Sequence, residues 1–372
     1  MPDDSFNAAI TWLDEPLRLR EDGPLAGRTL LVKDLFDTAG IRTTYGSRIY
    51  ADHVPERTAP TVTRLLEAGA TLVGKANLHE FAWGTTSQNP WYGTVRNPAH
   101  PGRTTGGSSG GNAAALSAGL CDLGLGTDTG CSVRLPSACC ETIGLKTSWG
   151  LLSTEGVFPL CPTLDTVGPM ARTVADAALM WSVLSGRRVP VPRLDGLTVG
   201  LLRQAPAVDA RERPPVVDTA EAHTARLQEL GARVVEADVP DPDGDTWAVF
   251  FHEAARSHAG TYPARAEDYG ENVRRKLELA QDFLEPARAA DAYGAVERWR
   301  RYEPEVDLYA APVLAGPLPA ENCDELAERL TLSAFSRPFN LLGWAALAIG
   351  DMQLVAPRDE VVLAAGLAWE RG

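Results

Sequence analysis

The hydrophobic positions of this chain predict short buried strands that alternate with helices. The first clear apolar run, TLLVK (29–33), follows several turn residues and predicts a strand that ends at Lys33. A helix is expected next, capped by Thr58 and continuing through Leu66, and TLVG (71–74) predicts the following strand. Functional groups of α/β sheets gather at the carboxyl ends of strands, so Lys33 is a candidate for chemistry.

One arrangement of helix, glycine and strand occurs twice. LLEAGATLVG (65–74) is echoed by LQELGARVVE (227–236), and two such units predict parallel strands joined by helical crossovers. Between them, GGSSGGNAAALSAGL (106–120) predicts a glycine-rich loop and a closely packed helix, because small side chains let backbones approach. A further strand is expected around residues 121–125. The pattern therefore indicates an α/β protein.

The chain shows no clear linker, so a single domain over residues 1–372 is expected. We divide this domain into a core of residues 20–186, a variable part of residues 187–330 and a C-terminal return to the core over residues 331–372. The variable part is rich in Pro and Arg at its start, and helical patterns fill residues 247–302.

Composition and charge exclude several classes of protein. The 372 residues are 44% hydrophobic and 23% charged, which is typical of a folded chain long enough to bury a core. The net charge of −14 argues against a surface that follows nucleic-acid phosphates, so we expect no nucleic-acid partner. No apolar run reaches the roughly 20 residues of a membrane span, and the acidic start, MPDDSFNAAITW, is unlike a signal peptide. We therefore expect a cytoplasmic protein without a membrane partner.

The spacing of cysteines and histidines gives no metal site. The six cysteines contain no C-x-x-C pair, and the six histidines contain no H-E-x-x-H motif. We expect neither a metal nor an organic cofactor. Cys131 and Ser132 nevertheless stand side by side in GTDTGCSVRLPS (126–137), and either could be a nucleophile.

Three segments carry the chemistry when they are taken together: LLVKDLFDTAG (30–40), TTGGSSGGNAAA (104–115) and GLGTDTGCSVRLPSACC (124–140). Together they resemble the amidase signature family, whose members hydrolyse amides with a Ser–Ser–Lys triad. The resemblance continues through residues 57–98 and 150–180, so it covers well over half of the chain. It implies the amidase-signature fold, with a central mixed β-sheet flanked by helices on both faces.

By position, the resemblance assigns the nucleophile to Ser132, a bridging serine in a cis peptide to Ser108, and the lysine to Lys33. A serine hydroxyl is a weak nucleophile until a base takes its proton, and here an amine must be that base. Lysine has an ordinary pKa of about 10.4, so a neutral amine near pH 7 requires burial of the side chain. Ser108 would pass the proton between Lys33 and Ser132 and later protonate the departing amine.

Further residues acquire expected roles from the same resemblance. The backbone N–H groups of residues 129–132 can converge on the oxyanion of the tetrahedral intermediate. Ser109 is expected to hydrogen-bond Lys33, and Trp83 to line the acyl pocket, although a core role fits this aromatic side chain equally well. The supporting set consists of Thr129, Gly130, Cys131, Ala82 and Trp83 around the substrate, with Ser109 and the loop-bracing pair Asp128 and Arg134 behind them.

Two other motif interpretations have weaker support. GSSGG (107–111) matches the G-x-S-x-G nucleophile elbow, which would make Ser109 the nucleophile, but GRTT (102–105) before it is a poor strand. The same glycine run could be a phosphate-binding loop, but no G-K-[ST] follows it.

The chain departs from the family pattern in three places. Cys131 and Glu141 stand where relatives usually carry glycine. If the backbone at Cys131 were left-handed, its side chain would cost about 1 kcal/mol; otherwise the thiol would narrow the pocket. ALAIGDMQLVAP (346–357) joins two strands almost directly, where relatives have a longer loop over the substrate. The shorter connection removes part of the region in which the A subunit of the tRNA-dependent amidotransferase holds glutamine. The resemblance to that subunit therefore predicts a glutamine site less strongly.

The sequence therefore predicts an amidase that hydrolyses a small or medium carboxamide to an acid and ammonia or an amine through an acyl-Ser132 intermediate. The small amide substrate is the expected partner, and the oligomeric state is open, a homodimer included. Two alternatives remain. One is the glutaminase-type A subunit of a tRNA-dependent amidotransferase, and the other is a non-catalytic protein that has kept the fold.

Overall fold

One mixed β-sheet organises the protein. The computed structural model describes residues 3–208, 215–217 and 221–372. Its strands are β1 (Ala9–Leu17), β2 (Thr29–Lys33), β3 (Thr71–Ala76), β4 (Leu123–Asp128), β5 (Ile143–Lys146), β6 (Thr166–Ala171), β7 (Thr198–Leu201), β8 (Arg233–Glu236), β9 (Leu308–Pro312), β10 (Ala345–Ile349) and β11 (Met352–Ala356).

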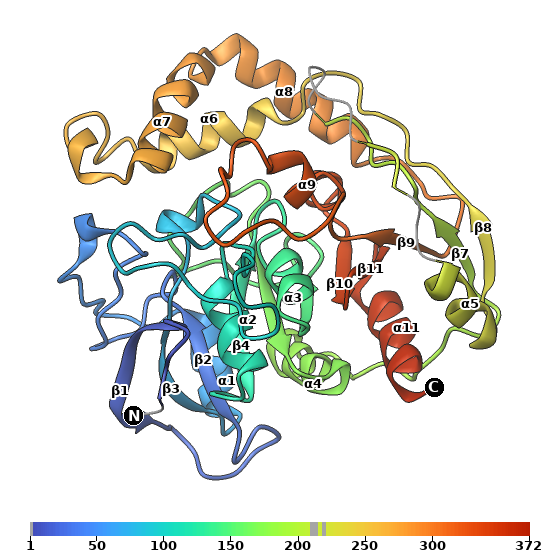
Figure 1. Cartoon of the computed structure of the whole chain (residues 1–372), viewed down its shortest axis with the longest axis horizontal. Helices are drawn as coiled ribbons and strands as arrows, with labels where there is room; N and C mark the ends of the chain where they lie inside the picture. The colour runs from blue at the N-terminus through green and yellow to red at the C-terminus, as the bar shows by residue number, and fades with distance from the viewer. Residues whose placement is uncertain (1–2, 209–214, 218–220) are drawn as a thin grey trace.

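Within the described residues, these eleven strands lie in the order β1-β3-β2-β4-β6-β5-β10-β11-β9-β7-β8 (Figure 1). The strand β2 runs parallel to its neighbours β3 and β4, and β7 runs parallel to β8 and β9. The remaining neighbours are antiparallel. The mixed sheet expected from the family resemblance is therefore confirmed.

Helices cover both faces of this sheet. The helices α2 and α3 pack on one face, against β2, β4, β5 and β10, whereas α1, α4 and α11 pack on the other. The helices are α1 (Pro60–Glu67), α2 (Gly110–Ser117), α3 (Arg134–Cys139), α4 (Val174–Ser185), α5 (Glu221–Glu229), α6 (Ala248–Ser257), α7 (Glu271–Ala280), α8 (Pro286–Trp299), α9 (Arg329–Ser333), α10 (Arg337–Leu341) and α11 (Asp359–Arg371), with 3₁₀ turns η1 (Arg48–Tyr50), η2 (Glu80–Ala82), η3 (Ala266–Asp268) and η4 (Gln281–Phe283).

Both predicted crossover units are present. The helix α1 joins β2 to β3 and α5 joins β7 to β8, and each pair of strands is parallel. The predicted cap of α1 is wrong, because the N-cap is Ala59 and the Thr58 hydroxyl instead accepts a hydrogen bond from the N–H of Ala39 at 3.0 Å. Pro60 in the first turn has no N–H to be capped, so the helix can begin without a side-chain partner.

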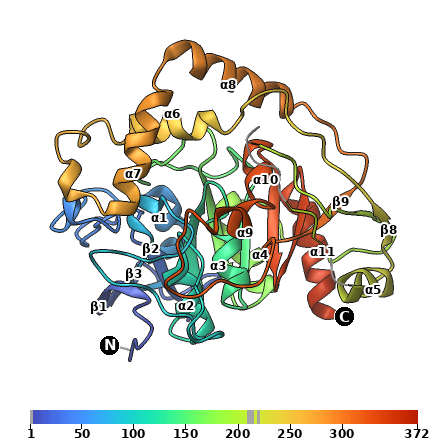
Figure 2. The ribbon, with the colours of Figure 1, turned by 45° about the horizontal axis from the view of Figure 1, so that its top comes forward.

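The helices α6, α7 and α8 form an arch beyond the sheet. Figures 1 and 2 show them across the top of the molecule, with the loops at the upper end of the sheet beneath them. They lie within residues 247–302, where the sequence predicts helices, and that prediction is confirmed. The arch forms a separate layer because α6 packs against α7 and α8 rather than against a strand.

The shortened connection near the C-terminus is a tight hairpin. The strands β10 and β11 pair antiparallel up to Ile349 and Met352, which leaves Gly350 and Asp351 in the turn. At Glu141, another of the three departures from the family pattern, the backbone has a φ of 55°, which lies in the region that favours glycine. Its carboxylate pairs with His100 at 3.1 Å on the surface.

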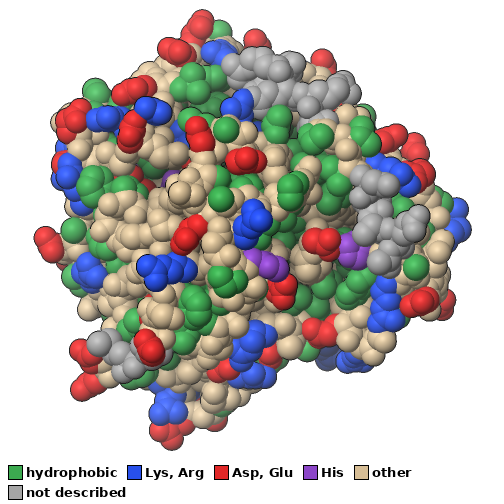
Figure 3. All heavy atoms as spheres, viewed as in Figure 1, with side chains coloured by type: hydrophobic (Ala, Val, Ile, Leu, Met, Phe, Trp, Pro, Cys, Tyr) green, Lys and Arg blue, Asp and Glu red, His purple; other side chains and the backbone are tan. Residues whose placement is uncertain are grey.

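Charges of both signs mix on the surface. Figure 3 shows Lys and Arg side chains interspersed with Asp and Glu over the face viewed in Figure 1. Among the described residues, no helix combines the length and the apolar character that a membrane crossing needs.

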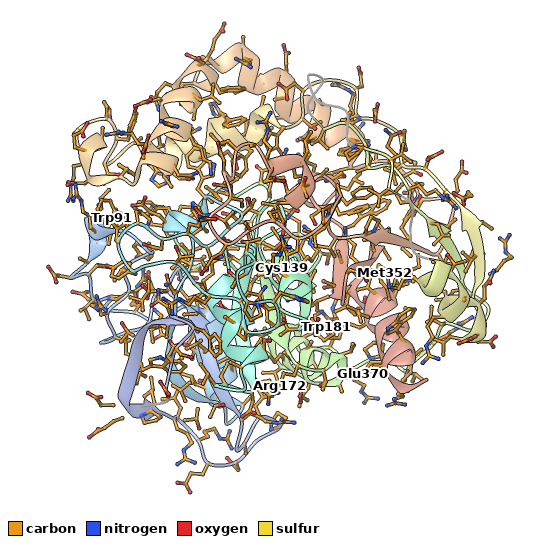
Figure 4. The ribbon with its side chains drawn as sticks, in the orientation of Figure 1. Trp91, Cys139, Arg172, Trp181, Met352 and Glu370 are labelled. Carbon is orange, nitrogen blue, oxygen red and sulfur yellow. The ribbon has the colours of Figure 1, made fainter. Side chains whose placement is uncertain are left out.

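The core separates onto the two faces of the sheet through the alternation of strand residues. Leu31 of β2 packs with α2, whereas its neighbours Leu30 and Val32 pack with α1. On the α1 face, Trp181 of α4 is fully buried (Figure 4). Its indole N–H donates to the Asp359 carboxylate at the start of α11 at 3.2 Å, so the one polar atom of this ring is satisfied.

Candidate active site

Three segments of the chain meet at the carboxyl ends of the central parallel strands. The strand β2 ends at Lys33, β4 ends at Asp128, and the loop before α2 carries Ser108. Because β2 and β4 are paired, the Lys33 amine reaches the Thr127 hydroxyl at 2.8 Å. It also donates to the Ser108 hydroxyl at 2.7 Å. The strand end predicted for Lys33 is therefore confirmed.

The two candidate serines belong to the same site. The peptide bond between Gly107 and Ser108 is cis. The Ser109 N–H donates to the Ser132 carbonyl at 3.2 Å and so holds the loop before α2 against the loop after β4. In the described part of the chain, the Ser132 hydroxyl makes no hydrogen bond, to Ser108 or to any other group, and Ser132 lines a cavity. A ligand in the cavity can therefore reach it.

Ser109 does not take the position expected for it. Its hydroxyl donates to the Thr127 carbonyl at 3.4 Å instead of contacting Lys33. The Thr127 hydroxyl is the second partner of the Lys33 amine, because parallel pairing places this part of β4 beside the end of β2. Sequence reasoning missed Thr127, although the neighbouring parallel strands were the signal that could have found it.

The surroundings of Lys33 lower its proton affinity. Its side chain is fully buried. Burial lowers the pKa of Lys33 from an ordinary 10.5 to about 7, against the opposing effect of the Asp128 and Asp165 carboxylates. A substantial share of this amine is therefore neutral at pH 7, as a general base requires.

The loop after β4 presents backbone donors that are not otherwise used. Among the described residues, no hydrogen bond uses the N–H of Gly130, Cys131 or Ser132. The Thr129 hydroxyl donates to Asp165 at 2.6 Å, and the same carboxylate accepts two further backbone N–H groups. The Asp165 carboxylate therefore holds the loop in place through the Thr129 side chain. The N–H groups of residues 130–132 stay available to an oxyanion.

Cys131 is a packed side chain and not a competing nucleophile. Its backbone lies outside the left-handed region, so the strain considered for a side chain at this position does not arise. The thiol is 2% exposed and lies 3.7 Å from the Gly107 carbonyl oxygen. Burial raises the pKa of the Cys131 thiol to about 12, which keeps it protonated at neutral pH.

The loop between β4 and α3 (residues 129–133) carries the candidate nucleophile Ser132, and we call it the nucleophile loop. Asp128 and Arg134, at its two ends, form a fully buried ion pair. Two N–H groups of the guanidinium reach the carboxylate at 2.9 and 3.0 Å. Burial alone would raise the pKa of Asp128, but Arg134 and further hydrogen bonds hold it at about 2. Arg134 also donates to Asn340 of α10 at 2.6 Å and to Gln353 of β11 at 3.0 Å. The predicted brace is present and continues into the C-terminal part of the chain.

We expect Arg134→Met to lower the free energy of unfolding by about 3–5 kcal/mol, because it leaves the Asp128 charge buried without its partner. Urea denaturation at pH 7 followed by circular dichroism measures this change. The control is Arg172→Met (Figure 4), which breaks a partly exposed pair with Asp122 and should cost less than about 1 kcal/mol. Equal losses in the two variants would contradict the assigned role of the buried pair.

Ser132 opens into a cavity of about 390 Å³. Ala82 and Trp83 both line it, and Trp83 belongs to a hydrophobic core cluster as well, so its ring fits both interpretations. Ala82 has a φ of 57°, an unusual conformation for alanine beside a ligand cavity. Among the described residues, no group of three or more His, Cys, Asp or Glu side chains is arranged to hold a metal ion.

Sequence reasoning missed the part of the cavity wall that lies far along the chain. Trp247 and Phe250 at the start of α6, Lys276 of α7, and Glu325 line the cavity. The aromatic run WAVFF (247–251) was a signal of an apolar face. Its spacing could not show that this face would meet a loop more than 100 residues earlier.

Comparisons with known proteins show the family and the fold of the chain. A family model described as Amidase matches residues 3–354. The chain is 35% identical to the A subunit of a glutamyl-tRNA(Gln) amidotransferase from Natronomonas pharaonis, over 93% of this chain and 92% of that protein. A crystal structure described as an amidase matches with a TM-score of 0.79 at 32% identity, over 93% of this chain and 84% of the other. The crystal structure of the A subunit of the glutamyl-tRNA(Gln) amidotransferase from Thermotoga maritima matches with a TM-score of 0.80 at 28% identity, over 99% of this chain and 88% of the other.

These relatives overturn one expectation. The prediction of no nucleic-acid partner is contradicted, because relatives over nearly the whole chain are named as subunits of a glutamyl-tRNA(Gln) amidotransferase. The net charge of −14 could not decide this question, because net charge describes non-specific attraction to phosphates and not which other chains a subunit assembles with.

Proposed function

This chain belongs to the Amidase family, and from that premise we propose that it cleaves carboxamides with Ser132 as nucleophile and Lys33, acting through Ser108, as base. The observation that carries the proposal is the fully buried Lys33 amine, which lies 2.7 Å from the Ser108 hydroxyl, in a loop that the neighbouring Ser109 N–H joins to the Ser132 carbonyl at 3.2 Å. An amine kept neutral by burial is the base that a serine hydroxyl needs when no histidine serves.

The proposed reaction proceeds in two stages. The Ser132 hydroxyl oxygen attacks the carbonyl carbon, and its proton passes through the Ser108 hydroxyl to Lys33. The C–N bond breaks as that proton returns to the leaving nitrogen, which departs as ammonia or an amine. Water then attacks acyl-Ser132 and releases the acid. The N–H groups of residues 130–132 stabilise the oxyanion in each stage, and each donor contributes about 3 kcal/mol.

The relatives favour a second candidate within the same chemistry. In that candidate the amide is glutamine, and the ammonia is passed on in a tRNA-dependent amidotransferase in which this chain is the A subunit. The names of relatives that match over nearly the full length support it more directly than they support hydrolysis of a free amide. The two-residue turn between β10 and β11 is the feature that opposes it, because the expected loop over the substrate is shortened.

Labelling with a fluorophosphonate tests whether Ser132 is activated, because such probes react with nucleophilic serines. We expect one adduct, located by mass spectrometry on the peptide that contains Ser132. Absence of labelling in folded protein would contradict the proposal and favour a non-catalytic protein. Ammonia release from L-glutamine compared with simple amides then separates the two candidates, because the second requires glutamine and copurifying subunits.

A further inference from the structure

We infer that the cavity in front of Ser132 selects carboxamides whose acyl group carries an apolar aromatic ring. This inference rests on the proposed function, since it assigns a substrate class to the same site. The cavity volume of about 390 Å³ lies within the range of small-molecule sites. Four aromatic side chains, three leucines and several charged groups contribute to its lining.

Three of the aromatic rings form a continuous wall. Trp247 and Phe250 stack with their ring centres 4.6 Å apart and their planes at 7°. Trp83 meets Phe250 edge-on, with ring centres 5.8 Å apart and planes at 73°. We call Trp83, Trp247 and Phe250 the aromatic wall. These rings are 4–7% exposed, so their mutual packing fixes the wall before any ligand arrives.

The aromatic wall stands directly beside the nucleophile loop. A Cβ atom placed on Gly130 would lie 3.3 Å from Cη2 of Trp247, so the edge of this ring is in contact range of the loop. Ser132 and the three rings line the same cavity, so a group bonded to the Ser132 oxygen shares that cavity with the wall. Ring edges carry partial positive charge, and the face of another aromatic ring is their preferred partner.

Two leucines continue the apolar lining to the mouth of the cavity. Leu279 of α7 and Leu326 both line the cavity and are 48% and 37% exposed. Large apolar side chains left in water beside a cavity are typical of a surface that an apolar ligand covers.

Two buried charged side chains that line the cavity beside the aromatic wall pair with each other. Lys276 and Glu325 pair at 2.8 Å, and Lys276 also donates to the Trp83 carbonyl at 2.8 Å. Glu325 accepts the backbone N–H of Thr85 at 2.9 Å. A neutral ring leaves this buried pair intact. The guanidinium of Arg337 lies over the Trp247 ring, 5.0 Å from its centre.

Binding to the Ser132→Ala variant tests this substrate class without requiring turnover. Isothermal titration calorimetry compares 3-phenylpropanamide with 3-cyclohexylpropanamide, which has the same chain length and a six-membered ring without aromatic character, and with L-glutamine. We expect the phenyl amide to bind at least about threefold more tightly than the cyclohexyl amide and at least about tenfold more tightly than glutamine.

Further variants in the Ser132→Ala background show which side chains produce the preference for the phenyl amide over the cyclohexyl amide. Phe250→Leu and, independently, Trp247→Leu should each bring the ratio of phenyl to cyclohexyl affinity to about 1, because they keep an apolar wall and remove a ring. The control is Trp149→Leu, which removes an indole that is 45% exposed and does not line the cavity, and it should leave both ratios unchanged.

The outcomes separate this inference from the proposed function. Tighter binding of glutamine, equal binding of the two ring amides, or no binding of the phenyl amide overturns the inference, even if the wild-type protein hydrolyses another amide. Preferential binding of the phenyl amide, together with no hydrolysis of any amide in the panel by the wild-type protein, supports the inference and contradicts the proposed function.

Discussion

Replacing Ser132 with alanine will lower kcat/KM for amide hydrolysis by about 10⁴-fold or more, because the variant has no oxygen to form the acyl-enzyme. The fold should persist, since in the described structure this hydroxyl makes no hydrogen bond whose loss would cost stability. Release of ammonia or amine measures activity, and thermal unfolding followed by circular dichroism measures the fold.

Ser137→Ala is the matched control for this experiment. Ser137 is a buried serine of α3 in the same part of the chain, and its hydroxyl has no hydrogen-bond partner in the described structure. Its removal should change kcat/KM by less than about threefold, as is usual for a change that disrupts no interaction. Hydrolysis at the wild-type rate by Ser132→Ala would rule out Ser132 as the nucleophile.

Replacing Lys33 with methionine will lower kcat/KM by about 10³-fold, because the thioether fills a similar space but cannot take a proton. The control is Lys146→Met. Lys146 is also fully buried, and burial together with Arg134 lowers its pKa to about 7, but its amine donates to the Thr147 carbonyl and not to a serine. Its loss should change kcat/KM by less than about tenfold. Similar losses in both variants would mean that Lys33 only supports the fold.

The pH dependence of the wild-type protein follows from the same lysine. The neutral amine is the active form, and burial lowers the pKa of Lys33 to about 7. The fraction of neutral amine rises as pH rises through this value, so kcat/KM should increase tenfold per pH unit below about pH 7 and level off above about pH 8. A profile that is flat from about pH 5 to pH 9 would exclude Lys33 as the titrating base.

The fold was accessible from the sequence where local patterns decide the structure. TLLVK predicts β2 because a short apolar run between turn residues has few other stable environments, and the repeated helix, glycine and strand unit predicts both crossovers. The cap of α1 was misassigned because Thr58 is a good capping residue, and no local pattern reveals that its hydroxyl is occupied by the N–H of Ala39.

The candidate site was accessible as far as its residues lie in motifs. Strand pairing brings the ends of β2 and β4 together, Lys33 reaches Ser108 in the loop before α2, and Ser109 of that loop bonds the Ser132 carbonyl. The aromatic wall could not be predicted, because Trp247 and Phe250 reach the site through the packing of α6, which no short motif encodes. The contradicted prediction about nucleic acid has a similar origin, since the net charge of a chain does not encode which other chains it meets.

The hydrogen bonds of Arg134 also set the time at which the site can be completed during synthesis. Its partners Asn340 and Gln353 lie 206 and 219 positions further along the chain. A nascent chain that has passed Ser132 but has not reached Asn340 lacks both acceptors, and one that has not reached Gln353 still lacks the second. The loop that carries Ser132 can therefore gain all the hydrogen bonds of its brace only after residues 340–353 have been synthesised.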